Sequence, residues 1–295
     1  MKLSVDQALS STRSNRNSLV ITVENLRHIA LCYGDGIAAR VLYTACRRIE
    51  SILPDSFGAL TIEPSGLRVQ GWGWDGEVEQ TRVLPALLLL CEPPIDIGQT
   101  RISVAVSVNK TQCFPAFDHK YWVPACFEQY RSDMEIAVVL YDALSSNRVD
   151  LVEYPLNAVE SNARCPYHRI QLKNIRCGTR VIATENIPSV LERLHLTRAY
   201  DRYLVHATID RLKTRPDRKL GCEVSALSAV DDIWWTSVRD ELTRNPSIAG
   251  RLVIEIREAS DPESRLQMTG FILAMQKLGC GVSFSGYGSG TACQR

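Results

Sequence analysis

The sequence predicts an α/β protein in which a sheet domain of α+β type is followed by an incomplete, open (β/α) barrel. Two observations indicate this fold class. The chain has 295 residues, about the length at which a single hydrophobic core gives way to two domains. Its second half alternates short apolar strand patterns with long helical ones, and repeated βα units of this kind are typical of a parallel sheet or barrel.

The composition is that of an ordinary globular protein, with 45% hydrophobic and 23% charged residues. With 34 basic against 33 acidic side chains the net charge is +1, so no overall field would attract nucleic acid or an anionic membrane. The N-terminus lacks the apolar core of a signal peptide, and the ten cysteines lack the clustered spacing of a zinc or disulfide framework. We therefore expect a cytoplasmic protein with a disordered segment at residues 1–18 and with neither a nucleic-acid nor a membrane partner.

Residues 19–155 predict a domain of strands and helices. Residues 19–23 are a β-branched run suited to a buried strand, and Asn25 leads into a helix that ends near Gly34. The other elements, each identified by apolar spacing and flanking turn residues, are helices at 37–53, 79–91 and 134–144 and strands at 59–62, 67–72, 102–108 and 149–154. Residues 156–166 are polar and suit a linker between domains.

This order of elements resembles the GGDEF (diguanylate cyclase-like) domain. Residues 25–34 and 40–42 look like the family's D-x-D-x-F-K-x-I-N-D-x-x-G-H-x-x-G-D segment. Residues 132–134 and 141–149 look like its A-D-x-A-M-Y-x-A-K-x-x-G-R-N-x-V segment. The resemblance implies a GGDEF-like fold for residues 19–155.

The positions that serve catalysis in the GGDEF family are replaced in this chain. The family's first metal-binding aspartate falls at Thr22, and Glu24 is the one plausible ligand that remains. The signature hairpin reads Ser65, Gly66, Leu67, Arg68 and Val69. A cyclase needs carboxylates to hold the metal ions that bridge triphosphate oxygens. We therefore expect these seven positions to be vestigial.

The second half of the chain predicts the barrel. Its strands are expected at residues 167–172, 180–183, 220–225, 251–256 and 281–284, and its helices at 197–214, 231–243 and 262–278. The last strand runs into a turn in which Gly286, Gly288 and Gly290 permit a sharp bend or a close approach to a ligand. Turns at the carboxyl ends of such strands are where α/β proteins place active sites, and a purely structural turn is the alternative.

Residues 167–295 resemble the EAL (cyclic-di-GMP phosphodiesterase-like) domain. Residues 201–205 look like the family's D-R-W-V-L helix, and 222–225 look like V-N-L-S. Residues 251–258 look like R-L-x-L-E-I-T-E, and 283–290 look like A-L-D-D-F-G-T-G. The tandem order of the GGDEF-like and EAL-like parts agrees with that of known GGDEF-EAL proteins.

Catalytic groups of the EAL family are missing. The E-A-L signature is kept in part at Glu185, but its phosphate-binding arginine is deleted. The family's metal-binding asparagine falls at Glu223, and its glutamate is kept at Glu255. Its two adjacent aspartates fall at Ser285 and Gly286. We expect a truncated barrel, because the sequence ends before the strands that carry the family's lysine and remaining ligands.

Three glutamates, Glu185, Glu223 and Glu255, could still converge at the strand ends and hold one divalent ion. Without a metal they repel one another, and little remains to activate water. The alternative is that Glu223 and Glu255 are solvated or pair with arginines. We expect no catalytic residue and no cofactor, with this vestigial metal site as the exception left open.

We therefore expect a catalytically inactive, GGDEF-EAL-like regulatory or adaptor protein of bacterial signalling that acts through protein–protein contacts. A barrel of about five strands leaves an open edge, so a protein partner or a second copy of the chain is expected to cover it. Two alternatives remain. One is a sensor that binds cyclic-di-GMP or GTP without hydrolysing it, and the other is a residual cyclic-di-GMP phosphodiesterase that uses the three glutamates.

Overall fold

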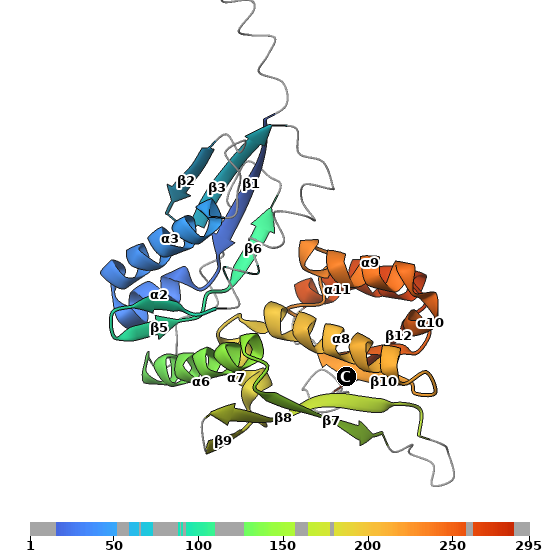
Figure 1. Ribbon diagram of the computed structural model, residues 1–295. Helices are drawn as coiled ribbons and strands as arrows, with labels where there is room; N and C mark the ends of the chain where they lie inside the picture. Colours follow the sequence, from blue (N-terminus) through green and yellow to red (C-terminus); the bar gives the residue numbers. More distant parts are fainter. Residues whose placement is uncertain are drawn as a thin grey trace, which may run out of the picture. The chain divides into compact units, whose positions relative to one another are not determined.

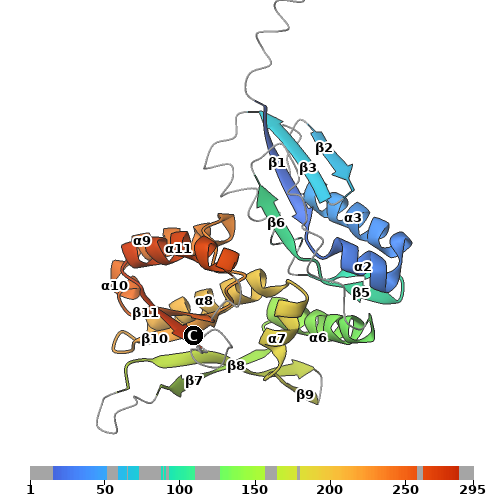
Figure 2. The same cartoon turned by 180° about the vertical axis from the view of Figure 1, so that it is seen from behind.

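The computed structural model describes residues 16–51, 59–64, 66–72, 88, 90, 93–109, 127–156, 165–177, 180–257 and 262–285. The chain divides into two compact units, Met1–Ser132 and Asp133–Arg295 (Figures 1 and 2). This division falls earlier than the linker predicted at residues 156–166. Helices and sheets occur together in both units, which confirms the predicted α/β fold class.

The first unit contains a four-stranded sheet in the order β2-β3-β1-β6 and a two-stranded ribbon, β4-β5. The strands are β1 (Arg16–Val23), β2 (Ala59–Glu63), β3 (Gly66–Trp72), β4 (Ile95–Ile97), β5 (Thr100–Ile102) and β6 (Val106–Asn109). All of their pairings are antiparallel. Because β1 begins at Arg16, the disorder predicted for residues 1–18 is wrong for the last three of them.

Two helices of the first unit, α2 (Leu26–Tyr33) and α3 (Asp35–Glu50), agree with prediction to within a few residues. The predicted strand 102–108 is interrupted, however, and the reason is Asn25. Its side-chain amide donates to the Ser103 carbonyl at 3.0 Å and accepts from the Ala105 N–H at 2.9 Å. These bonds occupy the Ser103 carbonyl and the Ala105 N–H, which a continuous strand would use to pair with a neighbouring strand. The helix predicted at 79–91 lies outside the described residues, apart from residues 88 and 90.

The second unit contains a six-stranded sheet in the order β12-β11-β10-β8-β7, with β9 paired to β8. The strands are β7 (Val149–Pro155), β8 (His168–Cys177), β9 (Arg180–Ala183), β10 (Leu220–Val224), β11 (Leu252–Arg257) and β12 (Gly281–Ser285). β8, β10, β11 and β12 run parallel, whereas β7 and β9 are antiparallel to β8. Over the described residues this sheet is open rather than closed into a barrel.

The ten-residue strand β8 has three partners. Its first three residues pair with β10, its last four pair with β9, and β7 lies along its other side. β7 was predicted as the last strand of the first domain. It belongs to the second sheet instead, because β7 pairs with β8 from Val149 to Pro155, along the whole length of β7.

The long helices of the second unit agree with its apolar spacing, whereas its short ones do not follow from it. The helices are α6 (Phe127–Ser145, in this unit from Asp133 onward), α7 (Ile187–Arg193), α8 (Thr197–Thr214), the 3₁₀ helix η2 (Ile233–Trp235), α9 (Thr236–Arg244), α10 (Pro246–Ala249) and α11 (Pro262–Lys277). α8 packs on β10 and β11 through side chains such as Val205, Ile209 and Leu212, which are fully buried. α7 and α10 were not predicted, because such short helices show no clear periodicity.

Gly221 on β10 allows the Tyr167 ring to lie directly against the sheet. A Cβ atom at Gly221 would be 2.6 Å from the ring carbon Cε2 and 3.0 Å from the Val253 carbonyl oxygen. Tyr167 comes just before β8, and its hydroxyl is 3.2 Å from Oγ of Ser283 on β12. The Tyr167 side chain therefore extends across β10 toward β11 and β12. None of the described helices has the length and apolar character that crossing a membrane requires.

Candidate functional site

Four polar residues lie in register near the carboxyl ends of the parallel strands. Glu223 on β10 is beside Glu255 on β11, and Arg257 on β11 is beside Ser285 on β12. Neighbouring positions of parallel strands project to the same face of the sheet. This arrangement brings both glutamates to the sheet edge at which α/β proteins bind ligands.

Glu255 is paired with Arg169, which extends from β8. Nε of Arg169 donates to Oε1 of Glu255 at 2.9 Å, and Nη2 donates to Oε2. Nη1 of the same guanidinium lies 3.9 Å from Oε2 of Glu223. Only 2% of the Glu255 side chain is exposed, so its charge depends on this arginine for compensation. Burial alone would lower the pKa of Arg169, but the hydrogen bond and charge of Glu255, together with the charges of Glu223 and Tyr167, raise it.

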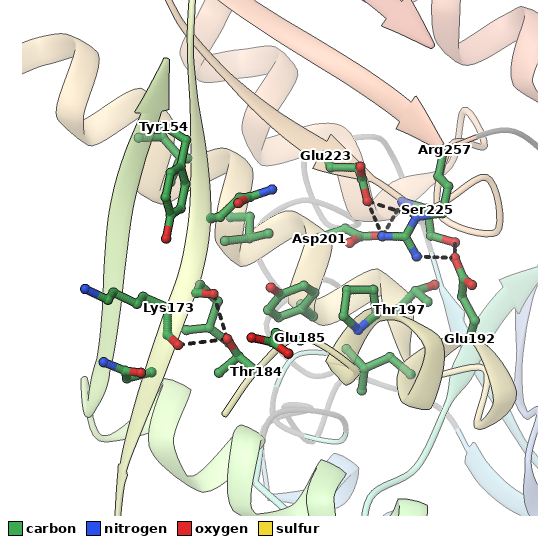
Figure 3. A pocket seen from close by; sticks show the side chains of 18 residues that line it. Tyr154, Lys173, Thr184, Glu185, Glu192, Thr197, Asp201, Glu223, Ser225 and Arg257 are labelled. Atoms are coloured by element: carbon green, nitrogen blue, oxygen red, sulfur yellow. Dashed lines mark hydrogen bonds and ion pairs between the residues drawn. The ribbon is translucent and has the colours of Figure 1, made fainter. Parts of the chain in front are cut away.

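Arg257 lies between two further glutamates, as Figure 3 shows. Its Nε donates to Oε1 of Glu223 at 2.8 Å, and its Nη1 donates to Oε1 of Glu192 on α7 at 2.9 Å. The Ser285 hydroxyl donates to the other oxygen of Glu223 at 3.0 Å. The result is a charge-paired network in which Glu192, Glu223 and Glu255 each have an arginine partner.

A cavity of 530 Å³ opens beside this network. It is lined by residues of β7, β8, β10, β11, α7, α8 and the turn after β9, among them Tyr154, Lys173, Glu185, Glu192, Asp201, Glu223 and Arg257 (Figure 3). Its volume is in the range of small-molecule sites. Four carboxyl groups against two cationic side chains give the lining an acidic balance.

Asp201 on α8 is a buried carboxyl group in the wall of this cavity. It accepts the backbone N–H of Ser225 at 2.9 Å. Burial raises the pKa of Asp201 to about 7, although hydrogen bonds from Ser228 and Ser225 and the charge of Arg257 oppose the shift. This carboxyl group therefore titrates near neutral pH.

The three glutamates of the predicted metal site do not share one position. Glu223 and Glu255 are adjacent, but both are bound to arginines, which is the alternative considered for them. Glu185 is exposed and lines the cavity with Glu223. Among the described residues, no group of three or more His, Cys, Asp or Glu side chains is placed to hold a metal ion. The metal site stays a prediction that this geometry does not favour.

Arg169, Glu192 and Asp201 are the site residues that the sequence reasoning missed as participants. Arg169 is on β8 and Glu255 is on β11, and β10 lies between these two strands in the sheet. The local sequence pattern does not reveal a contact between such separate strands. From the sequence alone, Asp201 stands out only as the first residue of the helix motif at 201–205. An acidic residue on the apolar face of a helix was the available signal, because such a residue needs buried partners. Of the expected glycine turn, Gly286, Gly288 and Gly290 lie outside the described residues.

In the first unit, the vestigial positions belong mainly to the core and to a hairpin. Thr22, Leu67 and Val69 are buried, and Arg68 forms an ion pair with Glu63 across β2 and β3. Gly66 begins β3, and Ser65 lies outside the described residues. Glu24 lines a cavity of 340 Å³ whose other described walls are largely apolar side chains of α2 and α3.

Residues 172–294 match the family model of the EAL domain. The network of Glu192, Glu223, Glu255 and Arg257 lies within the EAL match, and Arg169 lies just ahead of it. No curated protein matches the chain. The match does not include the first unit, whose GGDEF-like assignment stays a prediction.

Several solved structures are similar to the chain. Vibrio cholerae LapD, in a structure of its S helix, GGDEF and EAL parts bound to c-di-GMP, is 13% identical, with 94% of this chain and 72% of that chain covered and a TM-score of 0.44. An EAL domain protein from Listeria monocytogenes EGD-e is 17% identical, with 53% and 62% covered and a TM-score of 0.43. The Xanthomonas citri FimX EAL domain in complex with c-diGMP is 18% identical, with 52% and 60% covered and a TM-score of 0.41. At these identities the similarities concern the fold alone.

Proposed function

We propose that this chain is a non-hydrolysing, EAL-type regulatory protein of cyclic-di-GMP signalling that acts through contacts with another protein. One observation carries the proposal. Both glutamates at the carboxyl ends of β10 and β11 are bound by arginines, Glu255 by Arg169 and Glu223 by Arg257. The EAL match over residues 172–294 supplies the link to this signalling class.

The residues at the strand ends do not fit a divalent metal ion. Metal-dependent hydrolysis of a phosphodiester needs carboxylates that are free to coordinate the ion, which in turn activates water. Here a guanidinium already occupies both oxygens of Glu255. Ser285, at a position where the resemblance implies an aspartate, contributes only a hydroxyl. Displacing Arg169 would leave a buried carboxylate uncompensated until an ion replaced it.

A hydrolysis assay tests the loss of catalysis. The full chain is incubated with cyclic-di-GMP and millimolar Mg²⁺ or Mn²⁺, and the nucleotides are separated by chromatography. We expect no linear dinucleotide. Product formed by the wild-type chain and abolished in Glu255→Gln would contradict the proposal, whereas product formed equally by both would indicate a contaminating enzyme.

The cavity supports a second candidate, a sensor that binds cyclic-di-GMP without cleaving it. Lys173 and Arg257 offer positive charge to phosphates, and Tyr154, which is 46% exposed, offers an aromatic face to a base. The four carboxyl groups in the lining oppose a dianionic ligand. Titration calorimetry decides between these effects. Heat that disappears in Lys173→Ala supports binding, and the absence of heat removes this candidate.

The proposed protein contact is supported by β12, the end strand of the described sheet. Ser283 and Ser285 face Tyr167 and Glu223, so Phe284 projects to the opposite side, where it is 54% exposed. Leu273 on the adjacent α11 is 60% exposed. Analytical ultracentrifugation and pull-down tests with Phe284→Ser address this contact. A wild-type chain that is monomeric and captures the same proteins as the variant would count against it.

A further inference from the structure

The helices α8 and α9 are neighbours in the second unit (Figures 1 and 2), and a polar cluster outside the strand-end site joins them. Ser237 and Glu241 are four residues apart on α9, so their side chains lie on the same face of the helix. Both reach His206 on α8. Nε2 of His206 is 3.1 Å from Oγ of Ser237, and Nδ1 is 3.3 Å from Oε2 of Glu241.

Glu241 determines which ring nitrogen carries the proton. A carboxylate only accepts hydrogen bonds, so Nδ1 of a neutral imidazole donates to it and Nε2 remains free to accept from the Ser237 hydroxyl. Lys213 forms an ion pair with the other oxygen of Glu241 and so holds the carboxylate in place. The three side chains therefore have the order nucleophile, base and orienting acid.

The surroundings of His206 favour the neutral ring. Burial lowers the pKa of His206, and the charge of Arg202 lowers it further, while Glu241 and Asp210 oppose the shift. Lys213 weakens the pull of both acids, because it pairs with each of them. A neutral imidazole is the form that can take a proton from serine.

The same imidazole borders a cavity of 470 Å³, large enough for a small ligand. Its walls are mixed: Val149, Leu151, Tyr203 and Ala207 line it together with the polar or charged side chains of Asn147, Asp210, Arg211 and Thr214. Ser237 lies in the first turn of α9, where the positive end of the helix dipole favours negative charge on a nearby oxygen. His206 lines this cavity and contacts Ser237, whereas Ser237 itself is not among the lining residues.

We propose that Ser237, His206 and Glu241 form a nucleophilic site that accepts the acyl group of a small ester. This activity is separate from the signalling function proposed above. Oγ of Ser237 attacks the carbonyl carbon while its proton passes to Nε2 of His206. The bond to the leaving alcohol then breaks as the alcohol oxygen takes that proton. Water releases the acid from acyl-Ser237 by the same steps, which restores the serine hydroxyl and the neutral ring.

A fluorophosphonate probe, which bonds covalently to activated serines, tests this site in the full chain. We expect an adduct on the peptide that contains Ser237, detected by mass spectrometry and absent from Ser237→Ala. His206→Gln keeps an amide that can hydrogen-bond but removes the base, so labelling should slow about 100-fold. The exposed Ser247 on α10 supplies a matched control, because Ser247→Ala should label like the wild type.

Two measurements separate this activity from a merely structural contact. The labelling rate should increase as pH rises through the titration of His206, and melting curves should show that each variant is folded. A folded wild-type chain without an adduct at Ser237 overturns the proposal. So does equal labelling of the wild type and a folded His206→Gln. The cluster would then serve only to join the two helices.

Discussion

Arg169 and Glu255 form an ion pair that spans the whole width of β10, the strand between their own strands β8 and β11. Two hydrogen bonds join them, and the glutamate is 2% exposed. A buried ion pair of this kind stabilises the fold little more than well-packed apolar residues would. Removing one partner, however, leaves the other charge buried without compensation and is strongly destabilising. This asymmetry makes the arginine's structural role measurable.

Arg169→Met should lower the free energy of unfolding by about 3 to 5 kcal/mol, because it leaves the Glu255 carboxylate buried without a counter-charge. Urea denaturation measures the change. Arg176→Met is the matched control, since Arg176 and Asp150 form an exposed pair expected to contribute less than about 1 kcal/mol. The double variant Arg169→Met, Glu255→Met should recover most of the loss. Equal effects of the two single variants would contradict the structural role of Arg169.

Gly221→Ala should destabilise the second unit by about 1 to 3 kcal/mol, because the new methyl group would overlap the Tyr167 ring. Gly270→Ala is the control, since a Cβ atom at Gly270 meets only an ordinary contact of 3.6 Å with Asp231. In a helix this second change should stabilise by about 0.5 to 1 kcal/mol. Thermal melting compares them, and a neutral Gly221→Ala would mean that Tyr167 does not lie against β10.

Asp201 should make stability fall as pH rises toward neutrality. The pKa of its carboxyl group is raised from 3.8 to about 7 in the folded chain. Between these values the native state holds a proton that the unfolded chain has released, so stability is highest at the acidic end of the window. The slope approaches about 1.4 kcal/mol per pH unit at most and vanishes above the folded pKa. Asp201→Asn should remove this part of the pH profile, and identical profiles would refute the assignment.

Ser285→Asp should restore part of the metal-binding chemistry that the EAL resemblance implies. The new carboxylate would lie beside Glu223, because the serine hydroxyl is 3.0 Å from that side chain. Without metal, repulsion should lower the melting temperature relative to the neutral control Ser285→Asn. Added Mn²⁺ should raise the melting temperature of Ser285→Asp alone, since a ligand that binds only the native state stabilises it. The same response in all three proteins would contradict this view.

The parallel strands of the second unit could be predicted from sequence because each is a short apolar run between turn residues, as at 251–256. The sheet to which β7 belongs could not be predicted in this way. The local sequence pattern identifies a strand but does not reveal which other strand it pairs with. The same limit applies to the site. Glu223 and Glu255 could be found from motif positions, but their partner Arg169 depends on two strand pairings across β10.

The pairing of β8 with three other strands bears on how the second unit folds. β7, β8 and β9 are close in sequence and joined by antiparallel ladders, so they can associate with small loss of chain entropy. β10, β11 and β12 then attach outward in the same order in which they are synthesised. Assembly on the ribosome can therefore begin at the antiparallel end and advance strand by strand, with each newly added strand serving as the template for its successor.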